Sequence, residues 1–308
     1  KDTIFVKNRK EPIVETVKWT VWGPIDSEKK GDLHCDQAMR WLPIDRPETC
    51  VLATFRKLMV GKNTADYLDA MKNFDTPSQN YVFASSEGDV AIRPTGKTPI
   101  KLPGQGRRAQ DGSVSESNWH GFIPFDDMPF LKNPSRGWVG SANQNPAPPS
   151  YPYYLWGDDF EHFRSRRLND LAENMDSVTA EDMKKIQNDI YSVKAADALP
   201  AMLKLLNINE LSADEKKAAE QLAAWDFNYS PEKTEPTMFA MWYDSMYHAT
   251  WDEFFTKMES EKIAMSTPED WRFIQFLQKD TTSKWFDIVA TSEKETARAV
   301  ANISFKKM

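Results

Sequence analysis

Gly137-Trp138-Val139-Gly140-Ser141-Ala142-Asn143-Gln144-Asn145-Pro146 closes the least regular stretch of this 308-residue chain. The stretch runs from Pro94 to Pro152 and holds seven of the 12 glycines and ten of the 19 prolines. Helices and strands cannot continue far through it, because proline lacks a backbone donor and glycine is costly to order. Aromatic side chains are nevertheless interleaved, which is not typical of a flexible linker. We therefore expect an ordered wrap over a surface, the kind of segment that builds sites.

The residues before the wrap have the patterns of strands. Apolar and polar side chains alternate from residue 13 to 22 and Gly23-Pro24 follows, which predicts one half-buried strand. Residues 1–6 also resemble a strand, one that is already under way. Two runs at 81–84 and 90–93 flank a segment containing Gly88 and predict a hairpin. Apolar residues at helical spacing predict a helix over 64–74.

After the wrap the periodicity becomes helical, and no glycine follows Gly157. Helix starts are predicted at Thr179, Ser212, Thr250 and Thr267, and a last amphipathic helix over 292–303. Strands, then an irregular wrap, then helices indicate an α+β fold rather than an alternating parallel-sheet fold. The division we expect is a sheet-contributing part with the wrap, 1–157, and a helical part, 158–308.

Composition excludes several classes of protein. The net charge of -7, without long basic tracts, gives no reason to expect a nucleic-acid partner. A mean hydropathy of -0.62, without a long apolar run, excludes an integral membrane protein. A start at Lys1 without a signal peptide is what an excised precursor piece or a trimmed chain would show. Cys35 and Cys50 are either one loop-closing disulfide or two thiols, and the sequence does not decide between them.

The usual catalytic motifs are absent: there is no GxGxxG, P-loop, HExxH or GxSxG. The four histidines are widely spaced, and adjacent carboxylates such as Asp126-Asp127 are typical of solvated surface or helix caps. Asn143 and Asn145 could aim side-chain N–H groups into a cleft, where a neutral amide is a good oxyanion donor. The alternative is that both asparagines serve the turn, as loop asparagines usually do.

Seven segments in succession resemble motifs of the penicillin acylase family, which includes acyl-homoserine-lactone and cephalosporin acylases. Any one of these motifs is weak, whereas their shared order and spacing make the resemblance strong from residue 1 to about 206. The segments are Val17 to Pro24, Pro77 to Gly88, Asn118 to Pro129, Asn133 to Asn145, Tyr151 to Tyr154, Arg164 to Leu168, and Thr179 to Asp189.

The resemblance implies part of an αββα sandwich of the N-terminal-nucleophile hydrolases, and hydrolysis of an acyl amide. In that family the first residue of the processed chain, usually Ser, is the nucleophile, and its α-amine is the base. Here residue 1 is Lys, so the resemblance implies a central fragment that is inactive alone and whose nucleophile lies outside this chain. Asn145 falls on the family's oxyanion-hole Asn, Arg164 on an Arg that positions substrate and amine, and Gln79 on an acyl-pocket residue.

No cofactor and no metal are expected, because the family's calcium-binding carboxylates are missing or shifted here. The implied partners are a small-molecule acyl amide and the remaining segments of the same precursor, in the periplasm or secreted. The competing hypothesis is a non-catalytic secreted binding module of the same fold that uses its 11 tryptophans to recognise carbohydrate. The acyl and amine specificities are not readable from the sequence.

Overall fold

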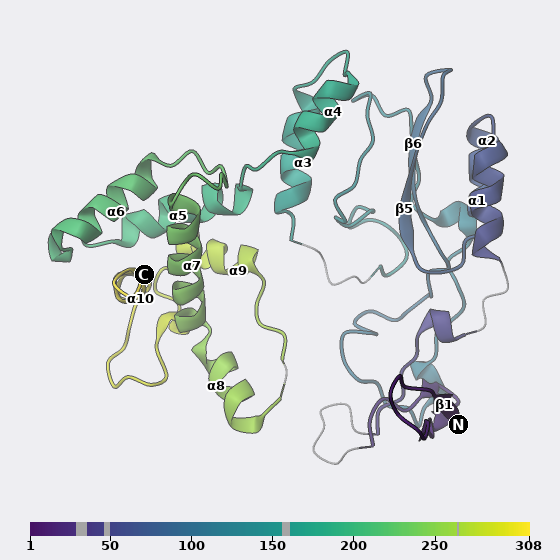
Figure 1. Ribbon diagram of the computed structural model, residues 1–308, viewed down its shortest axis with the longest axis horizontal. Helices are drawn as coiled ribbons and strands as arrows, with labels where there is room; N and C mark the ends of the chain where they lie inside the picture. Colours follow the sequence, from purple (N-terminus) through teal and green to yellow (C-terminus); the bar gives the residue numbers. More distant parts are fainter. Residues whose placement is uncertain (29–35, 46–49, 156–160, 264) are drawn as a thin grey trace. The chain divides into compact units, whose positions relative to one another are not determined.

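The computed structural model describes residues 1–28, 36–45, 50–155, 161–263 and 265–308. The chain forms two compact units, Lys1–Phe160 (unit 1) and Glu161–Met308 (unit 2). All described strands lie in unit 1, with two α-helices, and unit 2 is helical (Figure 1). The fold is therefore mixed α+β, with strands preceding helices, as the order of sequence patterns indicated. No helix among the described residues is both long and apolar enough to cross a membrane.

The largest sheet of unit 1 has the antiparallel order β5-β6-β7, with β5 at Gln79–Ala84, β6 at Val90–Thr95 and β7 at Leu131–Lys132. The predicted hairpin is confirmed, and Gly88 has the positive φ of 93° that its turn requires. The wrap contributes β7, which the sequence did not predict. Asn133 holds β7 in place because its backbone N–H donates to the Val90 carbonyl and its Oδ1 accepts from the Val90 N–H, both at 2.8 Å.

Helices α1 (Val51–Val60) and α2 (Thr64–Met71) lie beside this hairpin (Figure 1). The side chain of Asn63 caps α2 by accepting from the Asp66 backbone N–H. Tyr67, Ala70 and Met71 of α2 form a buried cluster against alternate residues of β5. The prediction of a helix from residue 64 is confirmed, although the helix ends at Met71 rather than at 74. Helix α1 was not predicted.

The N-terminal strands are short and exposed. Strand β1 (Asp2–Ile4) pairs with β2 (Ile13–Glu15), and β3 (Trp19–Thr20) pairs with β4 (Gly23–Pro24). The prediction of one half-buried strand over 13–22 is therefore wrong. Two ribbons form instead, and their side chains stay largely in solvent, with Trp19 62% and Val21 84% exposed.

The wrap from Pro94 to Pro152 is ordered but irregular. Besides β7 it contains 3-10 turns at Ser115–Ser117 and Phe125–Asp127, and Ile123 and Met128 are buried. A further 3-10 turn, Leu42–Ile44, precedes α1. Cys50 is exposed at the N-terminus of α1, whereas Cys35 lies outside the described residues, so their pairing is untested.

Unit 2 packs its helices around one apolar core in which Trp242, Trp251, Phe273 and Phe286 are among the largest fully buried side chains. Two 3-10 turns, Ile208–Glu210 and Lys284–Phe286, join the helices. The helices are α3 (Phe163–Glu173), α4 (Ala180–Gln187), α5 (Val193–Leu205), α6 (Ala213–Ala224), α7 (Glu235–Thr250), α8 (Asp252–Glu261), α9 (Asp270–Lys279) and α10 (Ala297–Phe305).

Two of the four predicted helix starts are confirmed, because Thr179 and Ser212 form complete capping boxes. Thr250 is not a cap: it ends α7, and its hydroxyl donates to the Met246 carbonyl at 2.8 Å. Thr267 does not start a helix either, since α9 begins three residues later and the Thr267 hydroxyl accepts from Tyr247. The last helix begins later than predicted, at Ala297.

Candidate functional site

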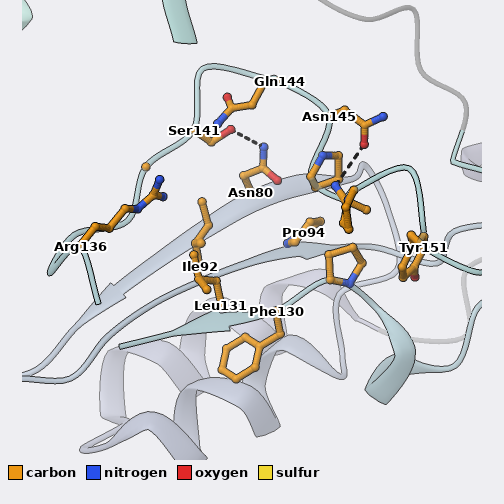
Figure 2. Close-up of a pocket in the computed structure, with 15 residues that line it drawn as sticks. Asn80, Ile92, Pro94, Phe130, Leu131, Arg136, Ser141, Gln144, Asn145 and Tyr151 are labelled. Carbon is orange, nitrogen blue, oxygen red and sulfur yellow. Dashed lines mark hydrogen bonds between the residues drawn. The ribbon is translucent and has the colours of Figure 1, made fainter. Parts of the chain in front are cut away.

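A pocket of about 340 Å³ lies in unit 1 between the sheet and the end of the wrap (Figure 2). Its floor is the face of the sheet opposite α1 and α2. Alternation along the strands places Asn80, Ile92 and Pro94 on this face, while Tyr81 and Phe83 pack toward the helices. The pocket is lined by Asn80, Ile92, Pro94, Pro129, Phe130, Leu131, Arg136, Gly140, Ser141, Gln144, Asn145, Pro146, Ala147, Pro148 and Tyr151.

Side-chain hydrogen bonds hold the roof of this pocket over the strands. Asn80 Nδ2 donates to Ser141 Oγ at 2.9 Å, which joins β5 to the wrap. Ser141 Oγ also accepts from the Asn143 N–H, and Gln144 Oε1 accepts from the Ala142 N–H at 2.7 Å. Asn143 itself has the left-handed φ of 69°, which asparagine tolerates better than most residues. The loop is therefore shaped by its own polar side chains.

Asn145 has one end of its amide fixed and the other directed away (Figure 2). Its Oδ1 accepts from the Ala147 backbone N–H at 3.1 Å, a local turn typical of asparagine. Among the described residues its Nδ2 donates no hydrogen bond, and the side chain is exposed at the pocket wall. The turn role and a donor role thus coexist in one residue, since each uses a different atom.

Arg136 is the one charged side chain among the pocket residues, and its guanidinium stacks 3.9 Å from the Trp138 ring centre. Tyr151 closes the other end, where its hydroxyl donates to the Asp127 carbonyl at 2.8 Å. Burial raises the pKa of Tyr151, so its hydroxyl stays protonated. No His, Asp, Glu or Lys lines this pocket within the described chain, so it offers hydrogen-bond donors rather than a general base.

Of the other two predicted site residues, Gln79 is not among the residues that line this pocket, and Arg164 belongs to the other unit. Gln79 is exposed at the start of β5, where alternation places it on the face opposite Asn80, and it is not a lining residue. Arg164 is exposed in the first turn of α3 in unit 2, while Asn145 belongs to unit 1. Asn80 was not predicted as a site residue. Its alternation with Val82 along the strand was the signal that placed it on the face away from Tyr81 and Phe83.

The two arginines after Arg164 are held by carboxylates of unit 2. Arg166 makes a bidentate ion pair with Asp197 of α5, and Arg167 donates to both oxygens of Asp189 at 2.8 and 2.7 Å. The hydrogen bonds from Arg167 lower the pKa of Asp189. These ion pairs fix the orientation of α3 within unit 2, and hence the direction in which the Arg164 side chain extends from the helix.

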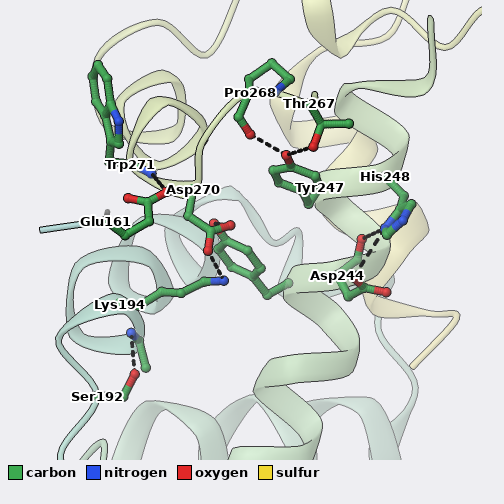
Figure 3. Close-up of polar contacts among 12 residues, drawn as sticks. Glu161, Ser192, Lys194, Asp244, Tyr247, His248, Thr267, Pro268, Asp270 and Trp271 are labelled. Atoms are coloured by element: carbon green, nitrogen blue, oxygen red, sulfur yellow. Dashed lines mark hydrogen bonds and ion pairs between the residues drawn. The ribbon is translucent and has the colours of Figure 1, made fainter. Parts of the chain in front are cut away.

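A second polar cluster in unit 2 joins three helices (Figure 3). Lys194 of α5 lies 2.5 Å from Asp270 Oδ2 of α9, and its ammonium is 3.9 Å from the ring centre of Tyr243 on α7. The Tyr243 hydroxyl donates to the other oxygen of Asp270 at 3.0 Å, and burial raises its pKa strongly. Lys194, Asp270 and Tyr243 thus pair with one another, which indicates that they stabilise the packing of the three helices. Within the described residues no cluster of three His, Cys, Asp or Glu side chains could hold a metal ion.

This architecture has a counterpart among solved structures. The thermostable penicillin G acylase of Alcaligenes faecalis matches with a TM-score of 0.67, over 99% of this chain and 58% of that chain, at 17% sequence identity. The chain is thus an α+β protein with a penicillin acylase fold. The family model for penicillin amidase matches residues 1–308, and the chain belongs to that family.

Sequence relatives agree with this assignment. Acyl-homoserine lactone acylase QuiP of Pseudomonas aeruginosa is 23% identical over 328 residues, covering 97% of this chain and 38% of QuiP. Penicillin acylase 2 proenzyme of Pseudomonas sp. strain SE83 is 26% identical over 170 residues, covering 54% of this chain and 22% of that protein. The chain thus spans well under half the length of these relatives.

Proposed function

We propose that this chain is part of an amidohydrolase that cleaves the C–N bond of a non-peptide acyl amide. Family membership supports the reaction class, because relatives are named as acylases of penicillins or acyl-homoserine lactones. In the proposed reaction an N-terminal Ser, supplied by a segment outside this chain, attacks the acyl carbonyl. Its free α-amine takes the hydroxyl proton, since an α-amine has a pKa near 8. The amine product leaves with a proton, and water then hydrolyses the acyl-enzyme ester.

One observation carries the proposal: at the wall of the pocket the Nδ2 of Asn145 donates to no described residue, while its Oδ1 accepts from the Ala147 N–H. Attack on a carbonyl places negative charge on its oxygen, and a donor that is already oriented stabilises that charge without reorganising. A neutral amide also keeps its N–H at every pH at which the amine base works. We therefore assign Asn145 to the oxyanion hole.

The other two site residues follow from the same proposal. Arg164 would position substrate and the nucleophile's amine, because a guanidinium provides directed N–H donors that stay charged. Gln79 would contact the acyl group from the start of β5, outside the pocket of Figure 2, and favour a less hydrophobic acyl group. The remaining segments of the precursor would complete the active site, and the whole protein would work in the periplasm or after secretion.

The test begins with the native protein's N-termini, measured by mass spectrometry. The proposal expects cleavage of the precursor and a chain that starts with Ser. The processed protein should hydrolyse aromatic acetyl amides or acyl-homoserine lactones, and the 308-residue chain alone should not. One uncleaved protein without an N-terminal nucleophile would refute the proposal, and so would turnover by the purified 308-residue chain.

A further inference from the structure

Two amide side chains in the pocket of Figure 2 offer nitrogen donors to a ligand rather than oxygens. Gln144 Oε1 accepts from the Ala142 N–H at 2.7 Å, and Asn145 Oδ1 accepts from the Ala147 N–H at 3.1 Å. The side-chain nitrogens of Gln144 and Asn145 donate to no described residue. Each oxygen is thus held by its own loop, and each side-chain N–H remains for a group that accepts hydrogen bonds.

The charge of the pocket has the same preference. Among the described residues that line it, Arg136 is the only charged side chain, whereas the whole chain has a net charge of -7. No Asp or Glu of that lining opposes Arg136, so a cationic ligand would meet repulsion and an anionic ligand attraction. The N–H donors and the guanidinium together favour a ligand with a negatively charged oxygen group.

Arg136 is held in one orientation by Trp138. Its Nε donates to the Trp138 carbonyl at 3.0 Å, and its guanidinium lies 3.9 Å from the centre of the Trp138 ring. Its two terminal amino groups make no ion pair with a carboxylate of the described residues. A guanidinium that is already oriented loses less conformational freedom when it binds, and its planar end matches the two oxygens of a carboxylate.

Arg136 and Tyr151 lie at opposite ends of the pocket, with Ile92 and Pro94 of β6 between them (Figure 2). The middle of the pocket is therefore apolar, and one end is cationic. A cavity of about 340 Å³ with apolar walls and a few polar groups is typical of a small-molecule site. The ligand that complements it has an apolar body and one anionic end.

We propose that this pocket selects acyl amides that carry a carboxylate, and that the terminal amino groups of Arg136 bind this carboxylate. The apolar part of the substrate would cover Ile92 and Pro94, and its amide carbonyl would lie at Asn145. The inference rests on the proposed function, because it names the substrate class of that same pocket. A neutral amide of the same shape would keep the apolar contacts and lose the ion pair. Arg136 would therefore distinguish anionic from neutral substrates.

Calorimetric titration of the full-length protein tests the binding step without turnover. The ligands are 4-phenylbutyrate and the uncharged 4-phenylbutan-1-ol, which have the same apolar body and no amide bond. The variants are Arg136→Gln, which removes the charge, and Arg136→Lys, which keeps the charge without the planar fork. Arg56→Gln is the matched control, because Arg56 is an exposed cation on α1 of the same unit and does not line the pocket. Melting temperatures establish that each variant is folded.

We expect 4-phenylbutyrate to bind about fivefold more tightly than the alcohol, since Arg136 is exposed and its ion pair is partly screened. Arg136→Gln should weaken butyrate binding about fivefold and change alcohol binding less than about twofold. Arg136→Lys should weaken butyrate binding about twofold, and Arg56→Gln should leave it unchanged. The proposal is overturned by absence of butyrate binding, by equal affinity for the alcohol, or by an Arg136→Gln variant that binds butyrate like the wild type.

Kinetics of the processed protein then show which side of the amide carries the carboxylate. N-glutarylaniline has it on the acyl side and N-phenylacetylglycine on the amine side, and each acid is compared with its primary-amide counterpart. For the side that Arg136 binds, the preference in kcat/KM for the acid should fall about fivefold in Arg136→Gln.

Hydrolysis of all four compounds without any preference that depends on Arg136 would contradict the inference. A different result separates it from the proposed function: if none of the compounds is hydrolysed but butyrate binding depends on Arg136, the proposed reaction is wrong and the carboxylate site stands.

Discussion

The side-chain amide of Asn80 on β5 donates a 2.9 Å hydrogen bond to the hydroxyl of Ser141 in the wrap. The bond crosses from the sheet to the loop that carries Asn145, and both of its residues line the pocket. Ser141 Oγ in turn accepts from the backbone N–H of Asn143. The hydroxyl of Ser141 therefore holds the turn at Asn143 in a fixed position relative to β5.

Breaking this contact should loosen the roof of the pocket. We expect Asn80→Ala and Ser141→Ala each to lower the free energy of unfolding, with a coupling of about 0.5–1 kcal/mol between them, because the bond is exposed. A double-mutant cycle by urea denaturation measures the coupling. Strictly additive effects would contradict a direct Asn80–Ser141 interaction.

Asn145→Ala should lower kcat of the processed enzyme by about 10²–10³, with a much smaller change in KM, because the lost N–H acts on the transition state. Steady-state kinetics on an acyl amide measures both constants. Asn143→Ala is the control: the backbone of Asn143 has a left-handed φ and the residue belongs to the turn, so the cost of the substitution should appear mainly in stability. If both variants lose the same kcat, the oxyanion role of Asn145 is wrong.

Glu161→Gln should make the protein more stable at neutral pH but not in acid. Glu161 Oε1 accepts from the Trp271 N–H at 3.4 Å, and its buried Oε2 has no hydrogen-bond partner among the described residues (Figure 3). Burial, and then the nearby charge of Asp270, raise the pKa of Glu161 above its ordinary value of 4.5. The folded protein therefore binds this proton more tightly than the unfolded chain. The free energy of unfolding accordingly decreases as pH rises from the ordinary pKa of 4.5 through the raised pKa of the folded protein.

The expected gain in Tm for Glu161→Gln is about 2 °C at pH 8 and decreases toward pH 3, where the carboxyl is protonated in both states. Calorimetric scans across this pH range measure the difference. Glu220→Gln on α6 is the control, since Glu220 is exposed and should show no such trend. A difference that does not vary with pH would contradict the raised pKa as its cause.

Trp242→Ala should destabilise unit 2 by about 3–5 kcal/mol, because it would leave a cavity in the core. Trp242 is fully buried, packs 4.7 Å from the Phe305 ring centre, and donates its indole N–H to the Ala301 carbonyl at 3.1 Å. Met241→Ala, at a neighbouring residue that is 49% exposed, should change stability by less than about 0.5 kcal/mol. Urea denaturation compares the two, and equal losses would show that α7 does not pack as described.

Local signals in the sequence predicted the elements that neighbouring residues decide. The hairpin around Gly88 and the helices that begin after Thr179 and Ser212 depend on turn geometry and on caps within a few residues. Helix α5 was not predicted, and it continues through Pro200, because Leu199 and Met202 are fully buried in the core and outweigh the lost hydrogen bond.

The sequence by itself determined the α+β order, the irregular wrap and the family resemblance, since each depends on composition or on motifs read along the chain. Only the tertiary structure decided which faces are covered: residues 13–22 alternate like a half-buried strand, yet 14–21 are all exposed, and Gln79 and Asn80 fall on opposite faces of one strand. It also decided that β7 joins the sheet and that Asn145 meets Asn80 at one pocket. Such pairings depend on contacts between residues distant in sequence, whose energies no local pattern encodes.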